Sequence, residues 1–195
     1  MKKTVDAFDY SNQICHAMKK GILLTTADGD EVNTMTIGWG HMGIEWGRPI
    51  FVAYVRESRY TKQLLDKTGE FTVNIPMDTC DSKILGYCGT KSGRDYNKIR
   101  DCGLTLEQPN KISVPGIKEV PLTLECKVIY RQPQDLSLLP SDILNRLYPE
   151  DESGFRDAHT VYYGQILDAY IIEDRHKAAH PLRRFFFFRC RMPDS

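Results

Sequence analysis

The chain has 195 residues, of which 41% are hydrophobic and 27% charged, and its 26 basic and 26 acidic side chains balance to a formal net charge of zero. This composition suits one packed domain with appendages and argues against disorder. A nucleic-acid-binding protein normally carries a basic excess, and a membrane protein carries an apolar run of about 20 residues, but the sequence has neither. The first ten residues lack the apolar core of a secretory signal. We therefore expect a cytoplasmic protein that binds neither nucleic acid nor membrane.

Short runs rich in β-branched and aromatic residues predict six strands. In chain order they are residues 22–26, 34–39, 50–56, 71–75, 122–130 and 160–172. Between the first two, the sequence Asp28-Gly29-Asp30 predicts a hairpin turn. Many short strands separated by turns are typical of an antiparallel sandwich or barrel, and less typical of a parallel sheet whose strands alternate with long helices.

Short helices are predicted between the strands, at residues 11–20, 58 or 61 to 67, 78–85, 92–100 and 136–147. Gly69 suits the left-handed conformation that ends the second of them, and Pro133 and Pro149 bound the last. After Ile172 the sequence fits neither the helical nor the strand period. We therefore expect a domain at residues 1–172 and a C-terminal extension at residues 173–195, to which we assign no function.

The six cysteines predict no metal site, because none of them forms a Cys-x-x-Cys pair. They are Cys15, Cys80, Cys88, Cys102, Cys126 and Cys190. In a cytosolic chain the thiols are expected to be reduced.

Residues 33–40, Asn-Thr-Met-Thr-Ile-Gly-Trp-Gly, form the most informative segment. Glycines weaken a strand interior and often mark a place where a ligand or another backbone comes close. The segment combines two threonine hydroxyls and main-chain groups with Met35 and Trp39, a mixture that suits a flat, partly polar aromatic ligand. The alternative is an ordinary strand that enters a glycine turn.

Two further segments are suited to bind an anion. Residues 54–61 join a strand to a helix, and a helix N-terminus with nearby arginines and hydroxyls attracts phosphate; the alternative is a capped helix with solvated arginines. Residues 88–98 form a basic loop with Gly89 and Gly93, which lacks the order of a P-loop and could equally be a surface loop. His159 opens the last strand, where a histidine is usually a surface or core-edge residue.

In this order, the segments resemble the flavin reductase-like, FMN-binding split-barrel family, and in particular its flavoredoxin-type branch. The matching segments are residues 33–40, 56–61, 69–76 and 92–98, and the resemblance spans residues 10–172. It implies a mainly β fold: a six-stranded antiparallel Greek-key split β-barrel with several short peripheral helices. It also implies a homodimer that binds FMN near the subunit interface.

The resemblance assigns roles to individual residues. The isoalloxazine ring would be lined by Thr34, Met35, Thr36 and Ile37, the ribityl chain and phosphate by Arg56, Ser58, Tyr60 and Thr61, and the phosphate would be neutralised by Ser92, Arg94 and Lys98. The same binding set includes Cys88 and Gly93. His159 aligns with a family histidine near the flavin edge, but Ala158 stands where the family often has Asp.

The function implied is that of an FMN-binding oxidoreductase, either a flavin reductase or a flavoredoxin-like electron-transfer protein. NADH, NADPH or a redox partner protein would supply the electrons. Because the flavin itself carries out the chemistry, no protein acid–base pair is required. Two alternatives are a non-catalytic protein that binds FMN or another ligand, and a dimeric scaffold that has lost the flavin.

Overall fold

The computed structural model describes residues 1–77 and 81–173. Its main element is an eight-stranded antiparallel sheet in the order β3-β2-β6-β9-β10-β5-β4, with β1 paired to β10. The strands are β1 (Lys2–Thr4), β2 (Ile22–Asp28), β3 (Glu31–Ile37), β4 (Gly40–Glu45), β5 (Arg48–Arg56), β6 (Glu70–Ile75), β9 (Leu122–Pro133) and β10 (His159–Ile172). A separate two-stranded sheet pairs β7 (Leu106–Glu107) with β8 (Gly116–Ile117).

All six predicted strands are confirmed, as β2, β3, β5, β6, β9 and β10. The prediction did not include β4. Its two glycines and its partly exposed side chains do not show the alternation of buried and exposed residues that is typical of a strand. The strand forms by pairing with β5. The strand β3 ends at Ile37 and not at residue 39, and β4 begins at Gly40. The hairpin turn at Gly29 is confirmed, with φ of 61°.

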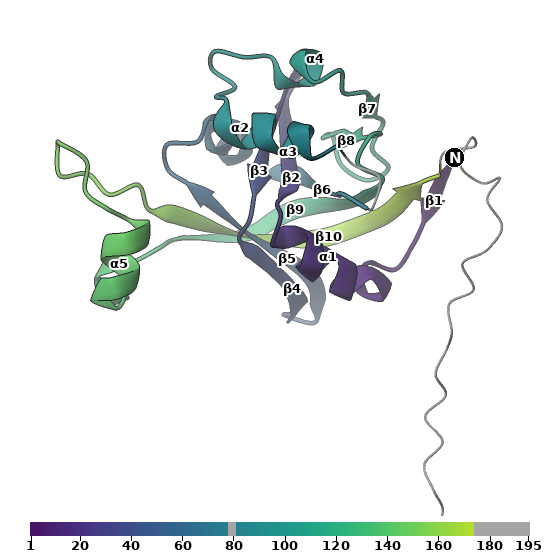
Figure 1. Cartoon of the computed structure of the whole chain (residues 1–195). Helices are drawn as coiled ribbons and strands as arrows, with labels where there is room; N and C mark the ends of the chain where they lie inside the picture. Colours follow the sequence, from purple (N-terminus) through teal and green to yellow (C-terminus); the bar gives the residue numbers. More distant parts are fainter. Residues whose placement is uncertain (78–80, 174–195) are drawn as a thin grey trace, which may run out of the picture.

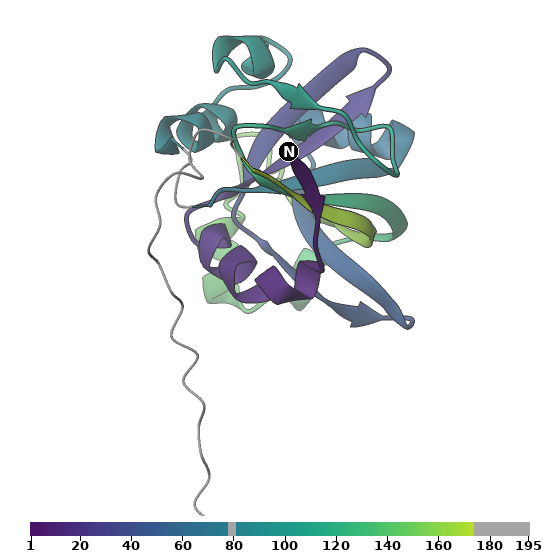
Figure 2. The same cartoon turned by 90° about the vertical axis from the view of Figure 1, so that its right-hand side faces the viewer.

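Helices cover both sides of the sheet (Figures 1 and 2). They are η1 (Ala7–Tyr10), α1 (Ser11–Met18), α2 (Tyr60–Thr68), α3 (Ser82–Thr90), α4 (Lys98–Asp101), η2 (Leu136–Leu138) and α5 (Ser141–Leu147). In Figure 1, α2, α3 and α4 lie in the upper part of the molecule and α1 in the lower part, beside β5 and β4, while α5 extends beyond the end of the sheet. The helix α2 packs against β2, and α3 packs against β3. No helix in residues 1–77 and 81–173 is long and apolar enough to cross a membrane.

The helix predictions were correct in part. Gly69 ends α2 with φ of 66°, as expected. The expected helix at residues 92–100 was wrong over most of its length, because Asn97 accepts a hydrogen bond from the Arg100 N–H and thereby starts the short α4 at Lys98. The expected helix at 136–147 is divided by Pro140 into η2 and α5. Part of the helix expected at 78–85 and all but Glu173 of the extension at 173–195 lie outside the described residues.

The core lies between the curved sheet and the helices, and it includes Leu24, Phe51, Phe71, Cys126 and Tyr162. The close packing leaves Gly164 of β10 no room for a side chain, since a Cβ there would lie 2.4 Å from Phe71 Cζ and 3.0 Å from Cys126 Cβ.

We expect Gly164→Ala to lower the free energy of unfolding by about 1–3 kcal/mol, because overpacking a dense core forces the neighbouring side chains out of place. Urea unfolding of the wild type and the variant measures the difference. Gly43→Ala is the matched control, because a Cβ at Gly43 of β4 meets nothing within 4 Å. Equal stability of the two variants would contradict the expectation.

Candidate functional site

Two clefts lie along β3, and the smaller one contains much of the predicted ring-binding segment. This Trp39 cleft has a volume of about 170 Å³ and is lined by Met35, Thr36, Ile37, Gly38, Trp39, Tyr54, Arg56, Arg59 and His159. Its lining includes two arginines and three aromatic or imidazole rings but no carboxylate. The Trp39 cleft therefore combines flat apolar walls with positive charge.

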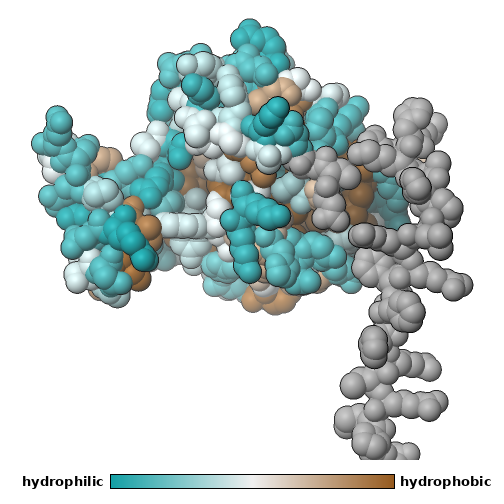
Figure 3. All heavy atoms as spheres, in the orientation of Figure 1, coloured by the Kyte–Doolittle hydropathy of each residue, from teal (hydrophilic) through white to brown (hydrophobic). Residues whose placement is uncertain are grey.

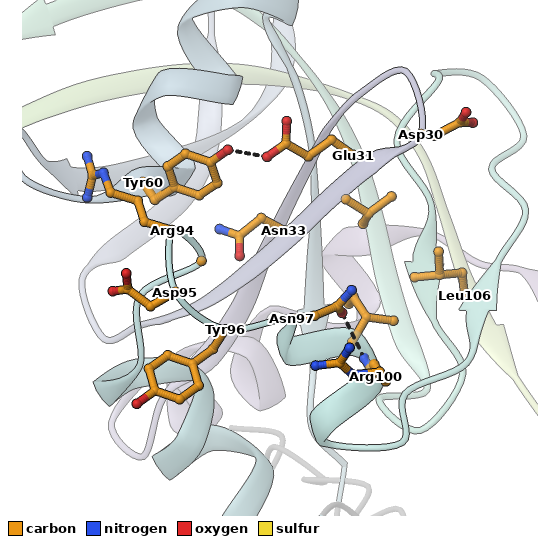
Figure 4. A pocket seen from close by; sticks show the side chains of 13 residues that line it. Asp30, Glu31, Asn33, Tyr60, Arg94, Asp95, Tyr96, Asn97, Arg100 and Leu106 are labelled. Atoms are coloured by element: carbon orange, nitrogen blue, oxygen red, sulfur yellow. Dashed lines mark hydrogen bonds between the residues drawn. The ribbon is translucent and has the colours of Figure 1, made fainter.

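The larger cleft, of about 600 Å³, is named here the Arg94 cleft (Figure 4). It lies between the start of β3 and the loop at residues 93–97, and Figure 4 shows Asn33 pointing from β3 towards the loop that carries Arg94 and Asp95. It is lined by Asp30, Glu31, Val32, Asn33, Tyr60, Gly93, Arg94, Asp95, Tyr96, Asn97, Ile99, Arg100 and Leu106. Because three of these are carboxylates, the Arg94 cleft suits an anion less well than the Trp39 cleft does.

The threonine hydroxyls of β3 are engaged inside the protein. Thr34 is fully buried, and its Oγ1 donates to the Leu24 carbonyl at 3.3 Å and accepts from Thr25 Oγ1 at 3.0 Å. Thr36 Oγ1 donates to the Leu85 carbonyl at 2.7 Å. What β3 still offers is its backbone, because it is an edge strand of the sheet and alternate main-chain groups of an edge strand have no partner strand.

Lys98 joins this edge strand to the end of α3 through two hydrogen bonds. Its side chain is buried, and Nζ donates to the Thr34 carbonyl at 2.9 Å and to the Cys88 carbonyl at 3.0 Å. Burial lowers the pKa of Lys98. The structure thus places this ammonium group on two protein carbonyls, and a role in neutralising phosphate stays a prediction.

Asp157, from the segment before β10, lies beside the start of α2 and engages two of the predicted phosphate residues. Its carboxylate accepts from the Ser58 N–H at 2.9 Å and from Ser58 Oγ at 2.7 Å. The Arg56 guanidinium donates to the Asp157 carbonyl at 2.8 Å and to the Leu147 carbonyl at 3.0 Å. Arg56 nevertheless lines the Trp39 cleft, whereas Ser58 lines neither cleft.

Two other arginines lie near the N-terminus of α2. Arg59 donates to the Gly89 carbonyl at 3.2 Å, and Arg94 donates to the Ser58 carbonyl at 3.1 Å. Arg94 also lies over the Tyr60 ring, at 5.4 Å from the ring centroid. Because a helix N-terminus carries a partial positive charge, Arg59, Arg94 and α2 together make a positive region at the start of α2, with Arg59 in the lining of the Trp39 cleft and Arg94 in that of the Arg94 cleft.

The loop with Gly93 packs directly on β3 and α2. A Cβ at Gly93 would lie 2.3 Å from Asn33 Oδ1 and 2.7 Å from Tyr60 Cδ1. The Asn33 amide itself donates to Thr61 Oγ1 at 2.7 Å. Glycine is therefore required at position 93 for this close approach.

The predicted site residues fall into three groups. Met35, Thr36, Ile37, Arg56 and His159 line the Trp39 cleft, and Tyr60, Gly93 and Arg94 line the Arg94 cleft. The rest lie outside both linings: Thr34, Ser58, Thr61, Cys88, Ser92 and Lys98. The individual role assignments did not include Gly38, Trp39, Tyr54 and Arg59, although all four lie in the candidate segments 33–40 and 54–61. Tyr54 could have been found from strand periodicity, since it lies two positions before Arg56 and so on the same face of β5.

His159 lines the Trp39 cleft and is 6% exposed. Its ring centroid lies 4.8 Å from that of Trp39, and its Nδ1 lies 2.9 Å from the Tyr148 hydroxyl. Burial lowers the pKa of His159 to about 4, with the Arg56 charge acting in the same direction and Asp157 opposing it. The imidazole is therefore neutral at pH 7.

This shifted pKa predicts a pH dependence of stability. An unfolded histidine titrates near 6.5, so between pH 6.5 and 4 the unfolded chain binds the proton and the folded one does not. The stability present above pH 6.5 should fall as the pH drops through this window, by up to about 3 kcal/mol at its lower end. We expect His159→Gln to show a shallower loss between pH 6.5 and 5 in urea unfolding; parallel curves would contradict this.

Comparison with known proteins agrees with this fold. The family described as "Flavin reductase like domain" matches residues 15–188, and the chain belongs to this family. A protein of Archaeoglobus fulgidus is 32% identical over 117 residues, which cover 60% of this chain and 65% of that relative. A Pyrococcus abyssi protein is 26% identical over 166 residues, 85% of this chain and 81% of the relative.

Solved structures extend the comparison. The flavoredoxin of Desulfovibrio vulgaris is similar with a TM-score of 0.59 and 23% identity, over 78% of this chain and 69% of that one. Flavoredoxin from Methanosarcina acetivorans has a TM-score of 0.58 and 25% identity, over 78% and 68% of the two chains. Component B of nitrilotriacetate monooxygenase from Bacillus cereus has a TM-score of 0.60 and 16% identity, over 88% and 79%. The predicted fold class is confirmed, with eight strands in the main sheet in place of six.

Proposed function

We propose that this protein is an FMN-binding oxidoreductase, a flavin reductase or a flavoredoxin-like electron-transfer protein. The observation that carries the proposal is the Trp39 cleft, in which the edge strand β3, the Trp39 ring and two arginines meet without a carboxylate in the lining. Membership of the flavin reductase-like family supports it, because the cleft lies on the segment that the family resemblance assigns to the flavin ring. The flavin would supply the redox chemistry, and the protein would bind and orient it.

In this proposal the ring lies along the edge of β3. The Thr34 carbonyl already faces away from β2, since it accepts from Lys98. The backbone groups of Thr36 face the same way, because main-chain groups in an antiparallel strand alternate sides. A backbone N–H there could bind an oxygen or nitrogen of the ring, while the threonine hydroxyls, both engaged elsewhere, hold the strand in place.

The phosphate would lie near the start of α2, between Arg59 and Arg94. Arginine binds phosphate through charge-assisted hydrogen bonds, and the helix N-terminus adds a favourable dipole. Gly93 allows the Arg94 loop to come close to α2. The remaining predicted residues of these segments line neither cleft and would hold the phosphate-binding groups in position: Ser58, Thr61, Cys88, Ser92 and Lys98.

A homodimer is part of the proposal. The Trp39 cleft, at about 170 Å³, is smaller than the roughly 300–1,000 Å³ of typical small-molecule sites. A second subunit would enclose the part of the ligand that one chain leaves uncovered. Figure 3 shows apolar side chains at the lower edge of the molecule, where β4 lies in Figure 1, and Ile44 and Trp46 there are 66% and 57% exposed. Sedimentation of the purified protein measures the oligomeric state.

The decisive experiment is anaerobic addition of NADH or NADPH to the purified protein, followed by absorbance. The proposal expects a yellow protein whose flavin bands bleach with one of the two nucleotides, or with a reduced redox partner protein. Flavin bands that no donor bleaches would indicate a protein that binds FMN without turnover. A colourless protein that leaves FMN fluorescence unchanged would contradict flavin binding.

A further inference from the structure

A chain of three hydrogen-bonded side chains runs from the α5 region into the Trp39 cleft. Tyr148 follows α5 and is 1% exposed. Its hydroxyl lies 2.7 Å from Gln134 Oε1 and 2.9 Å from His159 Nδ1. The Gln134 N–H also donates to the His159 carbonyl at 2.9 Å, so the two ends of the chain are joined through the backbone as well.

The number of available protons determines which nitrogen of His159 is protonated. A phenol has one proton to donate, and in the structure Tyr148 donates it to Gln134 Oε1. The Tyr148 oxygen can then only accept from His159, so Nδ1 carries a hydrogen. Because burial keeps the imidazole neutral, Nε2 has no proton and presents a lone pair.

This lone pair is open to the Trp39 cleft. His159 lines the cleft, beside the Trp39 ring. Within the described residues, Nε2 forms no hydrogen bond. Tyr170 Oη is among the fully enclosed side-chain atoms that lack a partner, and Nε2 is not among them. Nε2 is therefore not fully enclosed by the protein. A nitrogen that has no protein partner and is not enclosed is available to a ligand.

The Tyr148 ring is also positioned by contacts with Arg56 and Trp39. The Arg56 guanidinium lies over its ring, 5.2 Å from the centroid, while donating to the Leu147 and Asp157 carbonyls. The Trp39 ring meets Tyr148 edge-on at 6.3 Å. The hydroxyl that sets the state of His159 is therefore positioned by packing and not only by its own hydrogen bonds.

We propose that Tyr148 and Gln134 are positioning residues that hold His159 with Nδ1 protonated, so that Nε2 accepts a hydrogen bond from an N–H group of the ligand in the Trp39 cleft. The imide N–H of a flavin ring and the carboxamide N–H₂ of a nicotinamide are donors of this class, whereas a ligand carbonyl oxygen at the same place would be repelled. The ligand half of this inference rests on the proposed function; the protonation of His159 does not.

The first test is ¹⁵N NMR of the histidine side chains in the ligand-free protein at pH 7. The signals of His159 are those that disappear in His159→Gln. The inference expects a protonated Nδ1 and an unprotonated Nε2. The reverse pattern would overturn it, whether or not the protein binds a flavin.

Two variants distinguish this arrangement from the one with the opposite hydrogen-bond directions. In the opposite arrangement a rotated Gln134 amide donates to Tyr148, and Tyr148 donates to Nδ1. Gln134→Glu is the matched control, because an ionised carboxylate can only accept, and it should leave Nδ1 protonated. Tyr148→Phe removes the acceptor of the Nδ1 hydrogen and should produce a mixture of the two protonation forms. A change of form in Gln134→Glu, or none in Tyr148→Phe, would overturn the inference.

The ligand is tested by adding FMN and NAD⁺ separately. A shift of the Nε2 signal with FMN alone assigns the N–H to the flavin, and a shift that needs NAD⁺ assigns it to the nicotinamide. If the N–H belongs to the nicotinamide, Tyr148→Phe should slow flavin reduction by about 2- to 10-fold, the effect of one hydrogen bond, with FMN affinity retained; if it belongs to the flavin, Tyr148→Phe should weaken FMN binding by the same factor. An Nε2 signal that responds to neither ligand would overturn the ligand half and leave the protonation result standing.

Discussion

Replacing Arg59 and Arg94 together by alanine is expected to weaken FMN binding by about 100-fold while riboflavin binding changes by no more than about threefold. The two ligands share the ring system and the ribityl chain, and FMN alone has the phosphate. Arg59 lines the Trp39 cleft, and Arg94 reaches the Ser58 carbonyl at the start of α2, so both guanidinium groups lie where the phosphate is proposed to bind. Fluorescence titration of each flavin against the variant measures the two affinities.

The control removes the same charge from elsewhere on the surface. Arg131→Ala with Arg146→Ala also deletes two arginines; neither lines a cleft, the Arg131 side chain is 56% exposed, and Arg146 lies in the exposed part of α5. This pair should leave both flavins bound as in the wild type. Equal losses for FMN and riboflavin in the Arg59/Arg94 variant would show that these arginines shape the site and do not read the phosphate.

Lys98→Met is expected to lower the free energy of unfolding by about 2–3 kcal/mol and to weaken FMN and riboflavin binding to the same degree. Methionine fills a similar volume but cannot donate, so the Thr34 and Cys88 carbonyls lose the buried ammonium group that joins them. Since Thr34 belongs to the strand on which the ring is proposed to lie, loosening it affects both flavins. Urea unfolding and flavin titration measure the two effects.

The same variant tests the other role predicted for Lys98. If its ammonium neutralised the phosphate, FMN affinity would fall and riboflavin affinity would not. Lys67→Met is the control for stability, because Lys67 makes a salt bridge with Asp28 at the surface, with its side chain 63% exposed. Surface ion pairs of this kind contribute little, so the stability of that variant should stay close to that of the wild type.

Most of the sheet could be predicted because its strands carry a local signal. Strands such as β2 and β6 are dense in β-branched and aromatic residues and end at turn residues. By contrast β4 has glycines and an irregular burial pattern, and its conformation comes from pairing with β5. The loop at 92–97 was mistaken for helix because Ser92 suits an N-cap, whereas it is Asn97, at the start of the short α4, that accepts the capping hydrogen bond.

For the candidate site, the sequence could predict which segments of the chain come together but not which hydrogen bonds their individual groups form. Residues 35–37 of β3 and Arg56 do meet in one cleft, as the resemblance implied. Sequence spacing could not show that the Thr34 and Thr36 hydroxyls and the Lys98 ammonium group are engaged within the protein. Each of these groups finds its partner on another element, and a local pattern carries no information about such contacts.

The sequence by itself determined the class of fold, the family, and the segments 33–40 and 54–61 that line the Trp39 cleft, because strand propensity, turn glycines and motif order are local properties of the chain. The tertiary structure alone decided how the groups are used. It brought Asp157 to Ser58, 99 positions away, and Tyr148 to His159, and it buried His159 as a neutral imidazole in the lining of the Trp39 cleft. The physical reason is that hydrogen bonds and burial depend on which elements the sheet places side by side, and this is settled only when the whole chain folds.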